Sequence, residues 1–348
     1  MHLKLNARGG VERMLHYYLE QFSRWDWDVR LYSSEARKTE NTDPRYELVL
    51  KRVRWAPRWL RLVLFNILLG RDSKIKAADV GIGLNRIWHG EIACANGNHI
   101  GHCRAQKKTI LSPYDYIKIW LDKKSFKNSQ LILACSKMVQ YELVNDYGQP
   151  ASKIKLLPLP VDTSNFNKEL KQAQLQLKKK YGLSEDRINF LFVSTGHKRK
   201  GLDLLLEIFA DSRLADVNLY VAGTKFRSKL ANVYSLGFCD QIYELYAAAD
   251  ALLHPAHYEP YGLVIPESIA CGTPVITAAG VGASYLVEPR LGIVCSDLSK
   301  EVWLEEISSF KPERFDIPSD FAQANKLDIE SYMNEFKAII YSCVEARK

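Results

Sequence analysis

The sequence lacks the features that mark several large classes of protein. Its seven cysteines include no Cys-x-x-Cys pair and are odd in number, which favours reduced thiols over a disulfide framework or a zinc site. The longest apolar stretch, Leu60–Leu69, contains Arg61 and Asn66 and is about half the length of a membrane span. The N-terminal residues MHLKLNARGG include no apolar signal-peptide core. These absences predict a cytoplasmic protein that does not cross a membrane.

What is present is typical of a globular enzyme of more than one domain. The chain has 348 residues, of which 47% are hydrophobic and 25% charged. Its formal net charge of +8 suits anionic partners such as phosphates, nucleic acid or an acidic membrane surface, without choosing between them.

Short β-rich runs alternate with helical patterns along the whole chain. Many runs are almost continuously apolar, as strands buried on both faces must be, so we expect parallel sheets built from βαβ units. The expected strands are 29–33, 47–53, 79–84, 92–95, 131–136, 189–195, 218–223, 233–238, 251–255, 274–278 and 292–296.

The pattern restarts near the middle of the chain, where Pro158 and Pro160 forbid a regular continuation. We therefore predict an N-terminal domain over residues 1–163 and a second domain over residues 164–325. The remaining residues, 326–348, contain a helix with one apolar stripe, which could pack back on the N-terminal domain.

The strongest motif is HPAHYEPYGLVIPESIACGTP, residues 254–274. An apolar strand ends here, a turn carries Glu259 and Gly262, and a helix carries Glu267. The amino terminus of a helix offers free N–H groups and positive dipole charge to an anion. Carboxylates accept hydrogen bonds from the paired hydroxyls of sugars and ribose. From spacing alone, two surface glutamates on an ordinary strand–turn–helix are an equal alternative.

Residues 242–275, which contain this motif, resemble the E-x7-E region of the retaining glycosyltransferases of family 4. The resemblance implies a GT-B fold, in which two doubly wound Rossmann-like α/β domains face each other across a cleft. It implies that Glu259 contacts the donor sugar and that Glu267 holds the ribose hydroxyls. The backbone amides around Tyr261, Gly262 and Leu263 would cradle the phosphate. A front-face reaction that retains anomeric configuration, without a covalent nucleophile, is also implied.

A second signal is the run VSTGHKRKGLD at 193–203, where three cations precede an expected helix at 202–209. A solvated basic turn is the plain alternative. The family has a basic residue and a Lys-Gly pair here that bind the diphosphate. The compact spacing in this chain is similar to that of lipopolysaccharide core glucosyltransferases, so Arg199 and Lys200 are the expected catalytic cations. Such fixed cations can stabilise the leaving nucleoside diphosphate without a metal or another cofactor, so we predict a metal-independent enzyme.

Three weaker signals lie in the first half of the chain. Gly9 and Gly10 open a helix, and the resemblance implies that they line the donor site. Asn98 and His99 follow an expected strand and are candidates for acceptor binding, although a plain polar loop is favoured. The sequence Gly81-Ile82-Gly83 begins a dinucleotide-binding motif but lacks its third glycine.

Two stretches in the same half, 51–71 and 114–127, interleave basic and aromatic residues. Basic residues attract anionic headgroups and aromatic residues favour the membrane interface, so we predict peripheral contact with an anionic membrane surface. No recognised nucleic-acid-binding module accompanies the charge.

Together these signals predict an enzyme that transfers a hexose from a nucleotide diphosphate sugar, a UDP-sugar by preference. Its expected acceptor is a membrane-associated glycan or a lipopolysaccharide-type molecule, and its expected place is the inner face of the cytoplasmic membrane. The alternatives are a two-domain ligand-binding or regulatory protein without catalysis, a dinucleotide oxidoreductase, and an epimerase or phosphorylase on the same fold.

Overall fold

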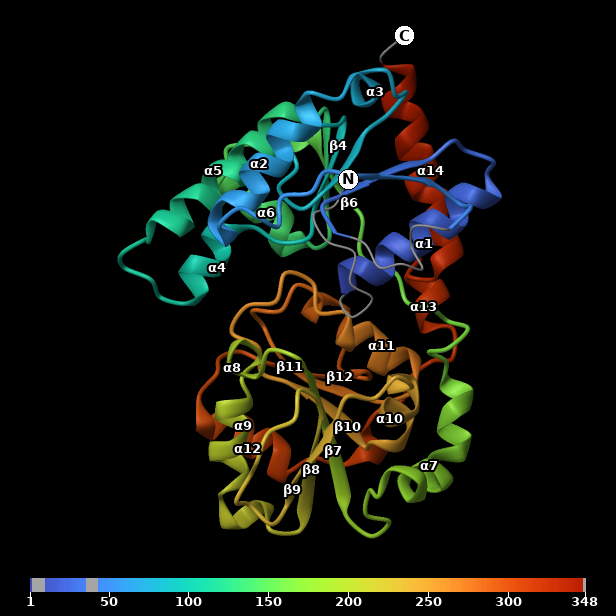
Figure 1. Ribbon diagram of the computed structural model, residues 1–348. Coiled ribbons are helices and arrows are strands. Elements are labelled where there is room, and N and C mark those ends of the chain that lie inside the picture. Colours follow the sequence, from blue (N-terminus) through green and yellow to red (C-terminus); the bar gives the residue numbers. More distant parts are fainter. Residues whose placement is uncertain (2–9, 36–42, 347–348) are drawn as a thin grey trace. The chain divides into compact units, whose positions relative to one another are not determined.

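The computed structural model describes residues 1, 10–35 and 43–346, and within α1 it describes side chains from Met14 onward. The chain divides into two compact units (Figure 1). Unit 1 consists of Met1–Leu159 together with Ile329–Lys348, and unit 2 consists of Pro160–Asp328. The predicted boundary was near residue 163.

The described residues of unit 1 form two parallel sheets, one of two strands (β1-β2) and one of four strands in the order β3-β4-β5-β6. Its strands are β1 (Arg30–Ser33), β2 (Glu47–Leu50), β3 (Ile82–Leu84), β4 (Ile92–Ala95), β5 (Leu131–Ala134) and β6 (Ile154–Leu156). Its helices are α1 (Gly10–Arg24), α2 (Arg58–Gly70), α3 (Ser73–Lys76), α4 (His99–Ala105), α5 (Pro113–Asn128), α6 (Lys137–Asn145) and α14 (Ile329–Glu345). Helices α1 and α14 lie on one side of the strands, and α2, α5 and α6 lie on the other (Figure 1).

Helix α14 is the last element of the sequence, yet it packs against the first helix. The hydroxyl groups of Tyr18 on α1 and Tyr332 on α14 are hydrogen-bonded at 2.6 Å in a buried contact. The ring of Phe336 lies 4.8 Å from that of Tyr18 and is fully buried. The apolar stripe read from the sequence therefore faces the core of unit 1.

Unit 2 is built around one parallel sheet of six strands in the order β12-β11-β10-β7-β8-β9. Its strands are β7 (Ile188–Ser194), β8 (Val217–Gly223), β9 (Val233–Gly237), β10 (Ala251–His254), β11 (Val275–Ala278) and β12 (Gly292–Cys295). Its helices are α7 (Gln174–Tyr181), α8 (His197–Lys200), α9 (Leu202–Phe209), α10 (Ile242–Ala248), α11 (Val264–Ala270), α12 (Lys300–Ser308) and α13 (Phe321–Ala324). Helices α9 and α12 cover one face of the sheet, and α7 and α10 cover the other (Figure 1).

The strand order of unit 2 reverses at one point. From β7 the chain moves outward through β8 and β9, and it then returns to place β10 on the other side of β7. The carboxyl ends of β7 and β10 therefore flank the switch point, which is where open α/β sheets bind ligands.

The local predictions differ from the structure in one place near this sheet. Residues 198–200 were expected to precede the helix at 202–209 as a loop, but they belong to the helical turn α8, which closes with a hydrogen bond from the Lys200 amide to the Gly196 carbonyl. Elsewhere in unit 2, a 3-10 turn at Lys168–Ala173 leads directly into α7. No helix among the described residues combines the length and apolarity that crossing a bilayer requires.

Candidate functional site

The loop after β7 and the loop after β10 are locked together by a glycine. Gly201 ends α8 with a positive φ of 86°. A Cβ atom at this position would lie 2.1 Å from the carbonyl oxygen of Pro255, which follows β10. Only glycine permits this approach together with this backbone conformation. The cations of α8 are therefore held directly beside the turn that carries Glu259.

An ion-pair cluster forms at this junction. The Arg199 guanidinium donates a hydrogen bond from Nη1 to Oε2 of Glu259 at 2.7 Å and another to the Tyr258 carbonyl at 3.1 Å. The Lys200 ammonium lies 3.6 Å from the same Glu259 oxygen. Burial raises the pKa of Glu259, but the nearby charges of Lys200 and Arg199 outweigh burial and hold that pKa below its usual value. Glu259 is therefore ionised at neutral pH.

The turn that follows Glu259 is fixed from the opposite side by residues 280–283. The Gly282 amide donates to the Glu259 carbonyl at 2.8 Å, and the Ala283 amide donates to the Tyr261 carbonyl at 2.7 Å. Gly262 has a φ of 91°, and a Cβ atom there would lie 2.7 Å from Cγ1 of Val281. The turn consequently has a single tight conformation, and α11 begins directly after it.

The second glutamate of the motif lies inside α11. Glu267 is only 4% exposed, and it accepts a hydrogen bond from the Tyr246 hydroxyl of α10 at 3.1 Å. Pro266 occupies the third residue of α11, within the first turn, where a missing backbone N–H is tolerated. Around the turn itself, the amide groups of Gly262 and Leu263 donate no hydrogen bond to any described residue. Amides that lack an acceptor in the protein can bind an anion.

One residue of the site was quoted in the sequence motif but given no role. His254, the last residue of β10, is 0% exposed, and neither ring nitrogen has a hydrogen-bond partner among the described residues. Burial, followed by the charge of Lys200, lowers the pKa of His254 to about 3. Its Nε2 lies 3.8 Å from where a Cβ of Gly262 would be. The ring is therefore neutral and lies beneath the Glu259–Gly262 turn.

The acceptor candidates Asn98 and His99 are buried in unit 1. The Asn98 side chain accepts from the Gly101 amide at 2.9 Å, which caps α4, and it also donates to Glu142. The His99 Nε2 atom and the Asp115 carboxylate are hydrogen-bonded at 2.7 Å. These contacts commit both side chains to the fold of unit 1. The acceptor role stays a prediction that these contacts do not support.

His99 belongs to a cluster that the sequence did not indicate. Ligand atoms of His99, Cys103 and Asp115 lie within 4.8 Å of one another, a spacing that could hold a metal ion. The Asp115 carboxylate, however, already accepts hydrogen bonds from the Ser112 hydroxyl at 2.7 Å and from the Lys108 ammonium at 3.0 Å. The Ser112 and His99 hydrogen bonds, followed by that of Lys108, hold the pKa of Asp115 well below its usual range. This network is complete without a metal, and Lys108 stands where a cation would bind.

The remaining predicted residues of the N-terminal half can be placed only in part. Gly9 lies outside the described residues, and Gly10 is the first residue of α1. The prediction of a metal-independent enzyme also overlooked an Asp-x-Asp sequence, Asp26-Trp27-Asp28. In the structure this segment joins α1 to β1, and Asp28 lies 3.5 Å from the Arg30 guanidinium.

Comparison with known proteins defines the class. Residues 174–327 match the family model described as glycosyl transferases group 1, and residues 8–165 match the one described as glycosyltransferase family 4. The chain belongs to this family of glycosyltransferases, and its fold is of the GT-B type. The predicted family, fold class and enzyme class are confirmed.

Among its relatives, a probable transglycosylase of Burkholderia thailandensis is 30% identical over 262 residues, which are 74% of this chain and 72% of that protein. The lipopolysaccharide glucosyltransferase WaaG of Escherichia coli K12 is 28% identical over 196 residues, about half of each chain (52% and 52%). The crystal structure of WaaG superimposes with a TM-score of 0.74 at 20% identity, covering 99% of this chain and 96% of that one. The sucrose-phosphate synthase of Thermosynechococcus elongatus reaches a TM-score of 0.79 at 18% identity, with 100% and 96% covered.

Proposed function

We propose that this glycosyltransferase transfers a hexose, with retention of configuration, from a UDP-sugar to a membrane-associated glycan or a lipopolysaccharide-type acceptor. The observation that carries the proposal is the Arg199–Lys200–Glu259 cluster at the switch point of the unit 2 sheet. The relatives add support: WaaG is named as a lipopolysaccharide glucosyltransferase, and a structural neighbour, Anabaena HepE, was solved with UDP-glucose at 17% identity and a TM-score of 0.69.

The cluster suits a reaction in which a diphosphate leaves. Negative charge grows on the leaving group as the glycosidic bond breaks, and preorganised cations lower the barrier by stabilising it. In the structure, Arg199 and Lys200 pair with the Glu259 carboxylate. A bound diphosphate would take over part of this pairing and leave Glu259 free to accept hydrogen bonds from sugar hydroxyls. Glu267, on α11, would hold the ribose hydroxyls, and the amides of Gly262 and Leu263 would meet a phosphate.

The test is release of UDP from a panel of UDP-sugars, with and without glycan acceptors. Glu259→Gln and Arg199→Ala should each lower kcat by about 100-fold or more, because each removes a charge at the reacting centre. The matched control is Glu301→Gln, an exposed glutamate at the start of α12, which should keep full activity. Turnover that survives both site changes contradicts the site, and donor binding without any turnover favours the non-catalytic alternative.

The same proposal includes a reaction without a metal. Arg199, Lys200 and the amides of Gly262 and Leu263 supply the positive charge that a divalent ion would otherwise supply. Activity should therefore be unchanged by EDTA. Loss of activity in EDTA that Mg²⁺ or Mn²⁺ restores would contradict this part of the proposal and would direct attention to Asp26 and Asp28.

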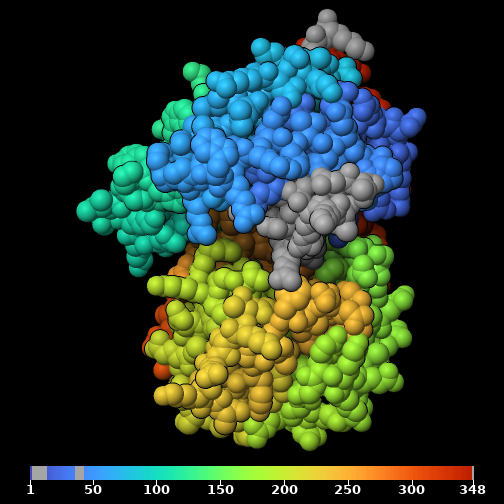
Figure 2. Space-filling model, in the orientation of Figure 1, coloured from blue at the N-terminus to red at the C-terminus, as the bar shows by residue number. Residues whose placement is uncertain are grey.

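We also propose that unit 1 docks on an anionic membrane surface at the cytoplasmic side. Helix α2 packs against α5, and aromatic side chains on and beside these helices are exposed, with Trp55 at 78% and Tyr116 at 61%. The segment between α4 and α5, drawn in teal, projects from unit 1, and its Ile110 is also exposed (Figures 1 and 2). Co-sedimentation with phosphatidylglycerol vesicles should fall with added salt and in Trp55→Ala/Trp59→Ala, and equal binding to neutral vesicles would contradict the proposal.

A further inference from the structure

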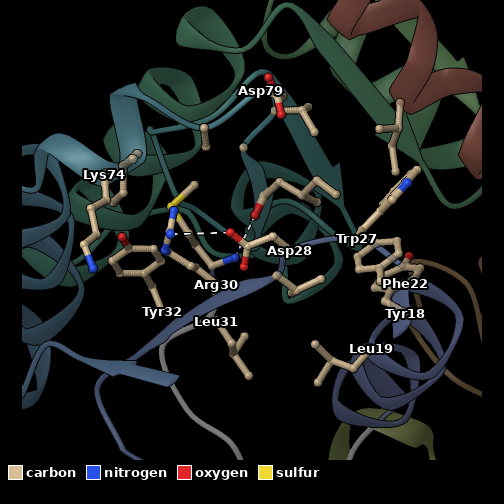
Figure 3. A pocket seen from close by; sticks show the side chains of 18 of the residues that line it. Tyr18, Leu19, Phe22, Trp27, Asp28, Arg30, Leu31, Tyr32, Lys74 and Asp79 are labelled. Atoms are coloured by element: carbon tan, nitrogen blue, oxygen red, sulfur yellow. Dashed lines mark hydrogen bonds and ion pairs between the residues drawn. The ribbon is translucent and has the colours of Figure 1, made fainter. Parts of the chain in front are cut away.

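Buried polar groups distinguish the site of unit 2 from the cavity of unit 1. That cavity, of about 540 Å³, lies between β1 and residues 79–84, and apolar side chains such as Leu19, Phe22 and Leu31 border it (Figure 3). A nucleotide carries hydroxyl groups and charged phosphates, which need polar partners. The buried carboxylate of Glu267 in unit 2 therefore suits a nucleotide better than this cavity does.

Glu267 is held by a side chain from the neighbouring helix. The Tyr246 hydroxyl of α10 donates a hydrogen bond to Oε2 of Glu267 at 3.1 Å, and the Tyr246 side chain is fully buried. A glutamate side chain has several rotatable bonds, and ordering them opposes binding. A hydrogen bond that orders the carboxylate before the ligand arrives removes part of this opposing entropy.

The Tyr246 side chain is itself fixed by its ring and by its backbone. Its ring packs near that of buried Phe166, with the centroids 6.1 Å apart. Its carbonyl accepts a hydrogen bond from the Thr273 hydroxyl at 2.6 Å, and the Thr273 oxygen accepts from the Lys171 ammonium at 2.9 Å. Lys171 also donates to the Ala249 carbonyl at 2.6 Å. The carboxyl end of α10 is thereby clamped, so the Tyr246 hydroxyl has little freedom to leave Glu267.

From these contacts we infer that Tyr246 is a positioning residue, which orients the Glu267 carboxylate toward the paired hydroxyl groups of the ribose. The inference rests on the ribose-binding role proposed for Glu267. Tyr246 acts through Glu267 and does not touch the nucleotide, because it is fully buried. One carboxylate oxygen can accept more than one hydrogen bond, so Oε2 can keep the Tyr246 contact while the carboxylate binds ribose.

This role predicts an effect on binding and not on the chemical step. The ribose lies outside the reacting bond, so its contacts stabilise the bound donor and the transition state alike. Removing the Tyr246 hydroxyl should therefore raise KM for the UDP-sugar and leave kcat within about twofold of its original value.

Tyr243, one turn earlier on α10, offers a matched control. Its ring lies 5.9 Å from that of Phe166, but its hydroxyl accepts from the Gln241 side chain at 3.3 Å in an exposed contact. Tyr243→Phe removes a hydroxyl from the same helix and the same aromatic group, and it leaves the Glu267 contact in place.

The experiment measures the affinities of UDP and of 2′,3′-dideoxy-UDP by calorimetric titration. The unchanged protein should bind UDP about 10-fold or more tightly, because only UDP can donate ribose hydrogen bonds to Glu267. In Tyr246→Phe this ratio should fall to about threefold or less, through weaker binding of UDP and nearly unchanged binding of the dideoxy form. Tyr243→Phe should keep the original ratio.

The ratio compares two ligands on one variant, so a change in the folded fraction cancels. An unchanged ratio in Tyr246→Phe, or an equal loss of affinity for both nucleotides, overturns the inference, because the hydroxyl would then serve only the fold. Equal affinities of the unchanged protein for the two nucleotides would contradict the proposed role of Glu267 itself, and the inference would fall with it. If Tyr246→Phe fails to fold, Thr273→Val, which removes the hydroxyl that holds the Tyr246 carbonyl, should lower the same ratio, and an unchanged ratio there is equally decisive against the inference.

Discussion

Single residues in unit 2 show how charge and burial compete at the site. Glu259 is nearly buried, with a side-chain exposure of 16%, and it keeps its charge because Lys200 and Arg199 outweigh the cost of desolvation. His254 lies beside the same groups but gains no partner, so burial and the neighbouring cations keep it neutral. The ionised Glu259 carboxylate and the neutral His254 ring therefore lie close together, and the charges of Lys200 and Arg199 favour both protonation states.

His254 should make stability depend on pH. Its pKa is about 3 in the folded protein and about 6.5 when unfolded, so between these values the unfolded chain binds the extra proton. Its contribution is therefore fully present above pH 6.5 and is lost as pH falls toward 3. Between pH 7 and pH 5 this loss is about 2 kcal/mol of unfolding free energy. His254→Gln should remove that part of the pH slope in denaturant unfolding.

The control for this prediction is His257→Gln, because His257 lies on the same loop but is exposed. Its pH slope should match that of the unchanged protein. A His254→Gln slope equal to that of the unchanged protein would show that the ring titrates normally in the folded state.

At the scale of elements, the site depends on short turns held by close backbone contacts. Helix α8 has only one turn, so the side chains of Arg199 and Lys200 would have no fixed direction if other contacts did not hold that turn in place. Gly201 fixes it against Pro255, and residues 280–283 fix the turn after β10. Two loops that are distant in the sequence therefore act as one rigid support for Arg199 and Glu259.

Gly201→Ala should disturb this support. The new Cβ would meet the Pro255 carbonyl and would also sit at a positive φ, so we expect a loss of roughly 2–4 kcal/mol in unfolding free energy. Activity should fall as the cations move. Gly196→Ala, at the other end of α8, is the matched control, since no atom lies within 4 Å of its added Cβ and its φ is −136°. Thermal unfolding of both variants measures the difference, and similar Tm values would refute the clash.

At the scale of the whole molecule, the chain crosses to unit 2 and returns. Its last helix, α14, completes the core of unit 1 through Tyr332 and Phe336. Unit 1 therefore cannot finish folding until the end of the chain is available. Unit 2 is continuous in sequence from Pro160 to Asp328.

Phe336→Ala should consequently weaken unit 1 and spare unit 2. Truncating a fully buried phenylalanine costs about 3–5 kcal/mol. Hydrogen exchange should accelerate in β3–β6 and remain unchanged in β7–β12. The exposed neighbour Asn334→Ala serves as the control and should change neither unit. Faster exchange confined to unit 2 would contradict the division of the chain described above.

The sequence by itself determined the family and most of the strands, although β6 (Ile154–Leu156) was not among the strands expected. Continuous apolar runs mark strands buried on both faces, so the run 92–95 predicted β4 and the stripe from Ile329 predicted α14. The family can be recognised from the sequence because the glutamate motif is contiguous. The turn and the helix of this motif follow from local residue types, including its glycines.

Only the tertiary structure decided which of these residues meet. The Arg199–Glu259 pair joins residues 60 apart, and it exists because the strand order brings β7 beside β10. The burial of Asn98, His99 and His254, and the packing of α14 on α1, likewise come from contacts between distant segments. Local propensity determines whether a segment forms a helix or a strand and which side chains share a face. Burial and side-chain pairing depend instead on the surfaces that the rest of the chain places against that segment.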